Sequence, residues 1–433
     1  MVVFRPFRGW RYNSAVVGDL AKVVSPPYDL ITPELQESLL QQSPYNVVHL
    51  EAGESLDWNA PVQGQYQGTS QIFEDWIQRG ALRRDQDPYY YLLKHDFSFQ
   101  GQRLSRLGLT GCVGLEEYEA QQVFPHEYTE EPAIRDRVSL MEACNANFSP
   151  IMALYKDSAR YLEPVFRKVM DAEPDIQIRA DSDQDLTLWR IGDPELQSRI
   201  HQFFTDTRVF LADGHHRYEA ALRFRCKQPG WFEEPIDHNP AHDFIMMTLI
   251  EFDDPGLLVL PYHRIVGGLP QPLLDQVQER LRQIFDAQPV ELATPDIAEG
   301  LLGEVLQAGD GAKVLGVFGP QNQGPHLLTL RDDVPWRDWG PLAISEAWIL
   351  EEQVLKPVLA DAMPEYLNWV HDHHDAVNRV VTGERQMAFL LKPFPMGRFE
   401  DVVGEGQRLP PKSTFFYPKL PTGLVINQLD DTV

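Results

Sequence analysis

The chain of 433 residues carries a formal net charge of −26, and 24% of its residues are charged. A field of that sign repels nucleic acid and anionic membranes, so we expect small-molecule partners, no nucleic acid and no membrane. Three widely spaced cysteines disfavour a disulfide scaffold and a cysteine zinc site, and no apolar run reaches the roughly 18 residues of a membrane span. We therefore expect a cytoplasmic protein of two or three domains.

The first candidate segment is a proline turn near the N-terminus. The pair Val23-Val24 is followed by Pro26-Pro27-Tyr28-Asp29, which predicts a short strand ending in a rigid turn. A helix should begin at residues 32–34, where threonine, proline and glutamate follow one another. The turn can present Tyr28 and Asp29 to a bound substrate. The alternative is a purely structural proline turn.

A second candidate lies beyond a predicted antiparallel hairpin formed by residues 89–93 and 107–115. His126 and Glu127 resemble the start of a zinc-protease motif, but Glu130 stands where that motif requires its second histidine. On a loop, His126 and Glu127 can act as a base or as metal ligands. The alternative is a solvated loop.

The most informative stretch is residues 207–227, TRVFLADGHHRYEAALRFRCK. The apolar run Val209–Ala212 is closed by Asp-Gly, and apolar residues then recur at helical spacing from Tyr218 to Phe224. This pattern predicts a buried strand, a tight turn and a helix.

The turn and the first helical turn form a predicted anion site. His215, His216 and Arg217 lie where free backbone N–H groups and the helix dipole favour negative charge. Gly214 lets the backbone approach a ligand, and Asp213 can act as helix cap, metal ligand or acid/base. The alternative is that Asp213 only caps the helix and the histidines are exposed polar residues.

A His263-Arg264 pair follows the apolar residues 257–260, at a strand end where it can meet a phosphate or carboxylate. The segment 267–273 is rich in proline and glycine and predicts a domain boundary. We therefore expect a mixed α/β chain with domains at 1–265 and 266–433, the second of α+β type.

Two further clusters lie in the C-terminal part. Residues 371–375, His-Asp-His-His-Asp, open a predicted helix, and a charged helix start is the preferred interpretation. The weaker interpretation is a metal cluster, in which His371 shares a helical face with His374 or with Asp375. Lys412, Ser413 and Thr414 resemble the end of a P-loop, but Pro411 replaces the required glycine. A lysine with two hydroxyl groups can still hold a phosphate, and a proline-rich edge segment is the alternative.

The order of five motifs resembles a widespread prokaryotic family of conserved proteins of unknown function. The matching residues are Pro26 to Asp29, Pro125 to Thr129, Ala212 to Ala220, Pro261 to Arg264 and Pro410 to Lys419. The resemblance spans nearly the whole chain, but the family itself implies no activity.

A more distant resemblance concerns residues 213–217, which are similar to the D-G-H-x-R motif of the ParB/sulfiredoxin-like superfamily. It implies a ParB/sulfiredoxin-like core within residues 1–265, whose loop and helix start hold nucleotide phosphates. His215 stands where sulfiredoxins have their essential cysteine, and the acidic charge disfavours ParB-type DNA binding. The free-serine-kinase branch is the least contradicted.

The leading hypothesis is a small-molecule kinase or nucleotide-dependent phosphotransferase that uses ATP or ADP with Mg²⁺. Gly214 and His215 would cradle phosphates, and His216 and Arg217 would neutralise the transferred group. Asp213 would hold Mg²⁺ or activate the acceptor.

The remaining roles belong to the other motifs. Glu127 would be the general base, oriented by His126. The predicted anion clamp comprises His263, Arg264, Lys412, Ser413 and Thr414.

Two rivals use overlapping residues. The first is a non-catalytic sensor of a nucleotide or acidic metabolite, which would bind its ligand without turnover. The second is a metal-dependent hydrolase or phosphatase with His126, Glu127, His215 and His263 as ligands, which would lose activity to chelators.

Overall fold

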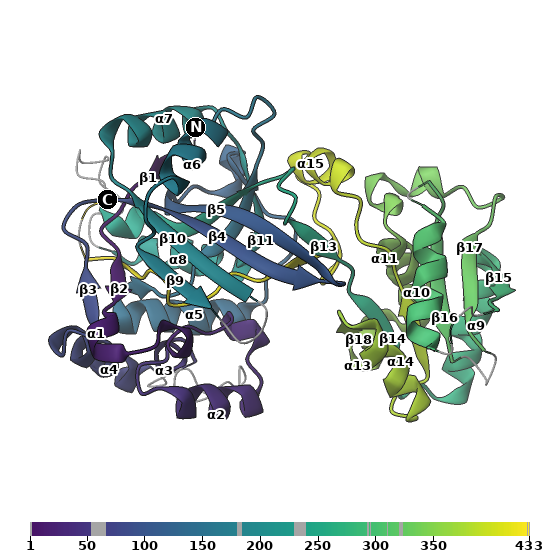
Figure 1. Ribbon diagram of the computed structural model, residues 1–433. Helices are drawn as coiled ribbons and strands as arrows, with labels where there is room; N and C mark the ends of the chain where they lie inside the picture. The colour runs from purple at the N-terminus through teal and green to yellow at the C-terminus, as the bar shows by residue number, and fades with distance from the viewer. Residues whose placement is uncertain are drawn as a thin grey trace. The chain divides into compact units, whose positions relative to one another are not determined.

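The computed structural model describes residues 2–52, 66–179, 184–228, 240–291, 294, 296–309, 311–319, 324–430 and 432. They form two compact units (Figure 1). The mixed α/β structure is as predicted. Unit 1 comprises Met1–Pro125, Thr129–Leu258 and Pro418–Val433; unit 2 comprises His126–Tyr128 and Val259–Tyr417. Each unit thus contains stretches far apart in the sequence. The predicted domains 1–265 and 266–433 stay a prediction.

Unit 1 is built on a large sheet with the strand order β6-β11-β8-β12-β5-β4-β10-β9, and β1 pairs with β5. Its main strands are β1 (Phe4–Arg5), β4 (Tyr90–Phe99), β5 (Gln102–Gly114), β6 (Val123–Phe124), β8 (Ile151–Tyr155), β9 (Ile176–Arg179), β10 (Gln184–Ile191), β11 (Val209–Asp213) and β12 (Phe244–Glu251). Short pairs are formed by β2 (Trp10–Tyr12) with β3 (Leu82–Arg84), and by β7 (Ala146–Asn147) with β21 (Asn427–Gln428).

The helices of unit 1 are α1 (Ser14–Val17), α2 (Pro33–Gln42), α3 (Val48–Glu51), α4 (Gln67–Gln78), α5 (Glu131–Cys144), α6 (Glu163–Met170), α7 (Pro194–Thr205) and α8 (His215–Cys226). Helices α5 to α8 place apolar side chains in the same core as the strands of the large sheet. Helix α5 packs directly beside α8. The predicted hairpin is confirmed, since β4 and β5 pair antiparallel with Leu92 opposite Leu109.

The predicted strand, turn and helix at residues 207–227 are confirmed as β11, Gly214 and α8. The first four residues of β11 are buried, because the strand lies between β6 and β8 inside the sheet. Gly214 adopts a left-handed conformation with φ +98°, which a residue with a side chain takes up only at a cost. The glycine therefore fixes the point where the chain reverses from strand into helix.

Unit 2 contains an antiparallel sheet with the strand order β15-β17-β16-β19-β14-β18. Its strands are β14 (His263–Val266), β15 (Phe285–Pro289), β16 (Val314–Phe318), β17 (His326–Leu330), β18 (Leu367–Val370) and β19 (Met387–Leu390); β13 (Leu258–Leu260) pairs with β20 (Phe415–Tyr417). The helices are α9 (Gln271–Ile284), α10 (Ile297–Gln307), α11 (Glu346–Trp348), α12 (Lys356–Leu359), α13 (Met363–Tyr366), α14 (His373–Val381) and α15 (Met396–Gly404).

Alternate residues of the central strands of unit 2 enter two different cores. Val266 and Phe389 pack with α9, whereas Ile265, Ala388 and their neighbours pack with α10 and α14. Since successive side chains of a strand point to opposite faces, the sheet carries helices on both faces. Helices α10 and α14 therefore share one face.

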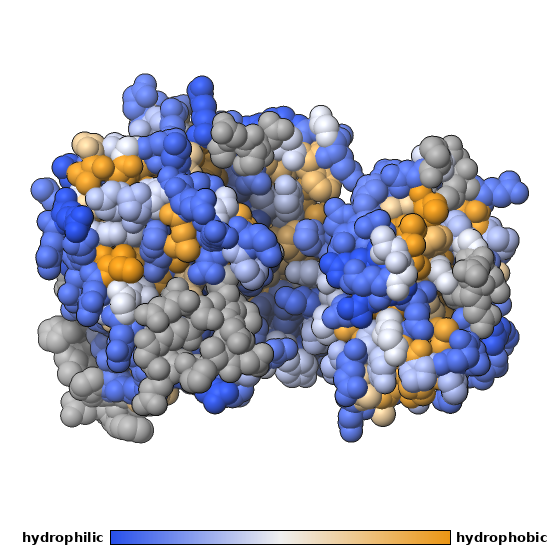
Figure 2. All heavy atoms as spheres, turned by 90° about the horizontal axis from the view of Figure 1, so that it is seen from below, coloured by the Kyte–Doolittle hydropathy of each residue, from blue (hydrophilic) through white to orange (hydrophobic). Residues whose placement is uncertain are grey.

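The surface is mostly polar. Figure 2 shows hydrophilic side chains over most of the visible face, with apolar side chains in small separate groups. Exposed large apolar side chains in the described ranges include Val16, Leu306 and Val381, which lie apart in the sequence. None of the described helices combines the length and the apolar character needed to cross a bilayer.

One buried histidine makes the stability of unit 1 depend on pH. His95 in β4 is almost fully buried, and its Nε2 lies 3.0 Å from Oε1 of Gln184. Desolvation, followed by the positive charge of Arg106, lowers the pKa of His95 to about 3. Below its unfolded pKa of about 6.5, the unfolded chain binds a proton that the folded chain does not. The free energy of unfolding should therefore fall as the pH drops through the window from about 6.5 towards 3.

We expect His95→Gln to remove about 2 kcal/mol of the difference in unfolding free energy between pH 7.5 and pH 5, because glutamine does not titrate. Urea unfolding followed by circular dichroism at both pH values measures the difference. His326→Gln, at a partly exposed position, is the control. An unchanged pH dependence in His95→Gln would contradict the effect.

Candidate functional site

The turn between β11 and α8 is closed by the side chain of Arg217. Its Nη2 donates to Oδ2 of Asp213 at 2.6 Å, and its Nη1 donates to the carbonyl oxygen of Pro150 at 2.6 Å. The guanidinium group folds over Gly214, where an added Cβ would lie 3.0 Å from Cζ, Nε and Nη2 of Arg217. Glycine is therefore required at position 214 for two reasons: the positive φ angle and the close approach of Arg217.

Asp213 is shared by two cations. Besides Arg217, it pairs with Nζ of Lys419, which is largely buried. The N-cap residue of α8 is Gly214, and Asp213 pairs with both cations, so the alternative that Asp213 acts only as a cap is wrong. Lys419 closes the fifth motif of the sequence, but nothing in the local pattern assigned it a role. Its partner lies more than two hundred residues earlier.

Tyr28 lies against two guanidinium groups. The Cζ atom of Arg137 is 4.2 Å from the centre of its ring, and that of Arg217 is 5.9 Å away. Burial raises the pKa of Tyr28 well above its ordinary value, so the hydroxyl stays protonated. The neighbouring Asp29, predicted with Tyr28 to contact a substrate, is exposed. The structure thus brings Tyr28, but not the exposed carboxylate, into the buried cluster.

A buried polar network extends from Tyr28 through Arg137. The guanidinium of Arg137 donates to Glu51, Asp136 and the hydroxyl of Tyr66, and Ser149 donates to Oε1 of Glu51 at 2.9 Å. Buried charges are tolerated when each has partners of opposite charge and satisfied hydrogen bonds. The sequence analysis missed these residues, because single charged residues on helices and loops carry no motif.

Two arginines of this region line the same cavity. It measures about 30 Å³ and is bordered by Glu51, Arg137, Asn147, Ser149 and Arg217 together with apolar side chains. That volume holds a water molecule or a group of similar size. The Nε of Arg217 is buried and has no hydrogen-bond partner among the described residues. A buried guanidinium N–H without an acceptor is costly, so this donor is a natural contact for a ligand.

The two histidines at the start of α8 differ in exposure. His215 is buried, whereas His216 is partly exposed. The Nε2 of His216 lies 3.0 Å from the backbone nitrogen of Glu130 and accepts its hydrogen. The proton of a neutral His216 is therefore on Nδ1. This contact ties the start of α8 to the residue that precedes α5.

Within the second motif, His126–Tyr128 belong to unit 2. The ring of His126 is buried, its Nε2 lies 2.9 Å from Oγ1 of Thr414, and Phe399 and Phe416 contact it edge to face. Nε2 of His126 and Oε1 of Glu127 are 3.8 Å apart. The side chains of Glu127 and His126 thus lie close together, as their predicted pairing requires. The phosphate-binding role predicted for Thr414 competes with its contact to His126.

Arg264 and His263 are also inside unit 2. Arg264 is fully buried and donates to Glu351, at 2.6 and 2.8 Å, and to the carbonyl oxygens of Tyr262, Pro411 and Lys412. Arg264 therefore supports the backbone of the segment that carries Lys412.

His263 is held in the same way by the fold. Its Nδ1 accepts the backbone N–H of Leu391. Desolvation, followed by the charges of His373 and Arg264, lowers the pKa of His263 to about 3, so its ring is neutral. A neutral imidazole ring attracts an anion less strongly than a protonated ring does. The lowered pKa of His263 therefore disfavours its predicted role in the anion clamp.

The remaining clamp residues lie on the same segment. Lys412 has a positive φ of 56°, and its Nζ lies 5.5 Å from the ring centre of Tyr262. Ser413 donates its hydroxyl to the carbonyl oxygen of Pro410 at 2.7 Å. The predicted site residues therefore divide between the units: Tyr28 and residues 213–217 are in unit 1, and His126, Glu127 and the clamp are in unit 2.

The metal ligands predicted for a hydrolase are divided between the two units. His126, Glu127 and His263 belong to unit 2, and His215 belongs to unit 1. Within the described part of unit 2, His126, Glu127 and His263 are not part of a set of three or more histidine, cysteine or acidic residues with ligand atoms close enough for one ion. A metal site that combines them with His215 stays a prediction.

We expect Gly214→Ala to lower the free energy of unfolding by more than about 1 kcal/mol, because the methyl group adds backbone strain and displaces Arg217. Gly80→Ala is the matched control: Gly80 also has a positive φ, of 69°, but an added Cβ there meets nothing within 4 Å. Urea unfolding of both variants separates the contact with Arg217 from backbone strain. Equal losses in the two variants would show that this contact is unimportant.

Comparison with solved structures finds matches of low identity and low TM-score. A conserved hypothetical protein from Pyrococcus furiosus is 12% identical with a TM-score of 0.36, covering 71% of this chain and 92% of its own. A free serine kinase variant in complex with ADP is 11% identical with a TM-score of 0.37, covering 71% and 89%. SbnI from Staphylococcus aureus, truncated at its C-terminus, is 11% identical with a TM-score of 0.35, covering 74% and 87%.

No curated protein matches the sequence. A family model described as "Protein of unknown function (DUF1015)" matches residues 4–341, which is most of the chain. The resemblance drawn from the five motifs is therefore confirmed at the level of the family. The chain belongs to the DUF1015 family of proteins of unknown function.

Proposed function

We propose that the protein is a phosphotransferase of the small-molecule kinase type, which binds a nucleotide phosphate at the turn between β11 and α8. The observation that carries the proposal is the position of Arg217. Its Nε is a buried donor without a partner in the described part of the chain, and its side chain lines a cavity together with Arg137. Charge-assisted hydrogen bonds from guanidinium groups to phosphate are strong and geometrically specific.

The local backbone supports the same ligand. Helix α8 begins directly after Gly214, so its first N–H groups and the positive end of its dipole lie at this turn. Anions bind at such helix starts. In this proposal, His215 and the turn at Gly214 contact the phosphates, and Arg217 neutralises the charge of the transferred group. His216 stabilises the start of the helix through its hydrogen bond with the backbone of Glu130.

The proposed cofactors are ATP or ADP with Mg²⁺. Asp213 fits poorly as a direct Mg²⁺ ligand, because Arg217 and Lys419 already pair with both of its oxygens. Mg²⁺ is commonly held by one or two carboxylates together with the phosphates of the substrate. We therefore expect Mg²⁺ to bind with the nucleotide rather than to the protein alone. The ion would neutralise charge on the phosphates.

Two carboxylates are candidates for the general base. Glu127, with His126 beside it, is the proposal that follows from the sequence. Glu51 is the acidic residue on the wall of the cavity that Arg217 lines, where Ser149 and Arg137 orient it. Loss of turnover in Glu51→Gln, with turnover retained in Glu127→Gln, would assign the role to Glu51. The reverse result would assign it to Glu127.

We expect ATP or ADP with Mg²⁺ to raise the melting temperature of the full-length protein, and Arg217→Lys to weaken this shift. Lysine keeps the charge but lacks the fork of donors that binds phosphate. The loss of one such donor group typically lowers turnover about 10²–10³-fold. Arg225→Lys is the matched control, since Arg225 is a buried arginine of the same helix that does not line the cavity.

Turnover is measured as ADP released with a panel of small hydroxyl-bearing acceptors, free amino acids included. A nucleotide shift without ADP release for any acceptor would favour the sensor, in which the same residues bind a nucleotide without chemistry. An equal shift in wild type and Arg217→Lys would refute the phosphate contact. EDTA added in the absence of nucleotide should leave the melting temperature of unit 1 unchanged, because Mg²⁺ is expected to bind together with the nucleotide.

A further inference from the structure

A second group of polar side chains lies on one face of unit 2, where two helices begin side by side. Helices α10 and α14 pack on the same face of the sheet through Ala298, Leu301 and Val377. Asp296 caps α10, and Asp372 caps α14, each by accepting backbone N–H groups of its own helix. The capped starts of the two helices therefore meet above a common apolar layer.

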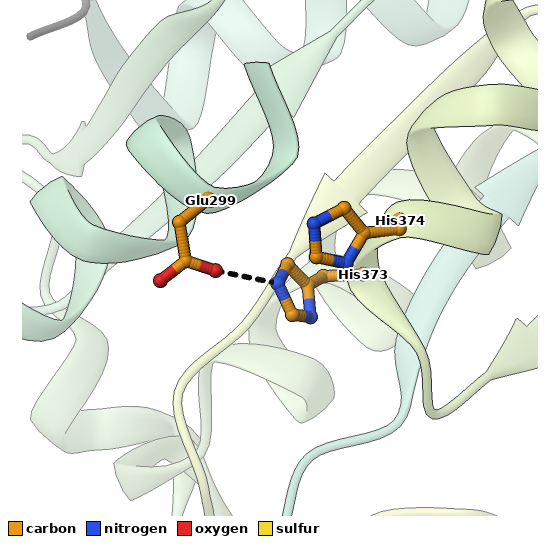
Figure 3. A group of neighbouring side chains, drawn as sticks. All are labelled: Glu299, His373 and His374. Carbon is orange, nitrogen blue, oxygen red and sulfur yellow. Dashed lines mark hydrogen bonds and ion pairs between the residues drawn. The ribbon is translucent and has the colours of Figure 1, made fainter. Parts of the chain in front are cut away.

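Three side chains at these helix starts converge. Nε2 of His373 lies 3.1 Å from Oε2 of Glu299, and the ring centres of His373 and His374 are 4.1 Å apart. One potential ligand atom from each of Glu299, His373 and His374 lies within 4.8 Å of the other two. Figure 3 shows Glu299 and His373 pointing toward one another, with the ring of His374 beside that of His373.

The sequence pattern alone suggested a different set. It paired His371 with His374 or with Asp375. In the structure, the ring of His371 stacks on Phe415 with centres 4.7 Å apart, and Asp375 pairs with Arg379 at 3.0 Å. The preferred interpretation of residues 371–375 as the start of a helix is confirmed, since α14 begins at His373. The missing partner, Glu299, comes from another helix.

The chemistry of this group fits a divalent transition-metal ion. Imidazole and carboxylate together are typical ligands of Zn²⁺, with bonds of about 2.0–2.2 Å. Glu299 and His374 are exposed and His373 is partly exposed, so their side chains can rotate to close the present spacing. The nearby carboxylates of Asp296 and Asp372 add negative charge, which offsets the positive ends of the two helix dipoles.

A histidine that binds a metal usually has an outer partner on its other nitrogen. Asp296 is already in the position of such an outer partner, because its Oδ2 lies 3.1 Å from Nε2 of His374. The other oxygen of Asp296 caps α10 through the N–H groups of Ala298 and Glu299. The carboxylate that orients His374 is thus itself fixed by the helix that carries Glu299.

We propose that Glu299, His373 and His374 bind one divalent transition-metal ion of the Zn²⁺ class, with Asp296 as the outer partner of His374. Three protein ligands leave the fourth position of a tetrahedral ion to water or to an external ligand. The site belongs entirely to unit 2, and it does not depend on the proposed function of unit 1.

The test uses the full-length protein without a histidine tag, stripped of metal by a chelator that is then removed. Zn²⁺ is titrated in competition with a chromophoric chelator, and Co²⁺ binding is followed by its visible absorption. We expect one Zn²⁺ per chain at micromolar concentration, not displaced by excess Mg²⁺, which prefers oxygen ligands. His373→Ala and Glu299→Ala should weaken binding by at least about 10–100-fold, the loss typical even for outer partners.

His326→Ala is the matched control, since His326 is a partly exposed histidine of the same unit outside the group. It should bind Zn²⁺ like the wild type. Thermal unfolding without metal confirms that the ligand variants are folded. Either of two results would overturn the site: no stoichiometric Zn²⁺ binding at micromolar concentration, or wild-type affinity in the double variant His373→Ala/His374→Ala. In both cases the contacts of these histidines would be ordinary surface hydrogen bonds.

Discussion

Both units depend on buried guanidinium groups that must find partners inside the protein. Transfer of a charge from water into the interior is unfavourable unless an opposite charge and hydrogen-bond acceptors compensate for it. Arg137 meets this condition with Glu51 and Asp136, and Arg264 meets it with Glu351. Because Glu51 and Glu351 lie on other elements than their arginines, each of these two ion pairs fixes the mutual position of segments that are remote in the sequence.

The same constraint explains the rigidity of the turn at Gly214. Arg217 connects the end of β11 with the carbonyl group of Pro150, just before β8. The guanidinium occupies the space that a side chain at position 214 would need. The absence of a Cβ at position 214 therefore does more than give a ligand access to the backbone. It also leaves the space in which Arg217 is buried at the start of α8.

Local patterns were sufficient to predict the strand, turn and helix around Asp213, since each depends on residues close together in the sequence. The same holds for the β4–β5 hairpin and the start of α14. The contacts of Lys419 with Asp213 and of Glu299 with His373 could not be predicted, because they join distant segments. The order of the motifs likewise did not reveal that they divide between two units.

The comparison of two motif arginines shows what a sequence leaves undecided. Arg217 and Arg264 each follow a histidine in the sequence, close to the end of a predicted strand. Both were therefore predicted to bind an anion. In the structure, Nε and both Nη atoms of Arg264 donate to Glu351 or to backbone carbonyl groups. Arg217 uses Nη1 and Nη2 in the same way, but its Nε has no acceptor among the described residues.

A satisfied guanidinium group gains little from a ligand, because a new acceptor would have to replace an existing one. A buried N–H without an acceptor gains a complete charge-assisted hydrogen bond. The net charge of −26 does not oppose such a contact, since it describes the long-range field, whereas Arg217 acts at contact distance inside unit 1. The balance of donors and acceptors around each buried arginine, rather than the motif in which it occurs, therefore favours Arg217 over Arg264 as the phosphate ligand.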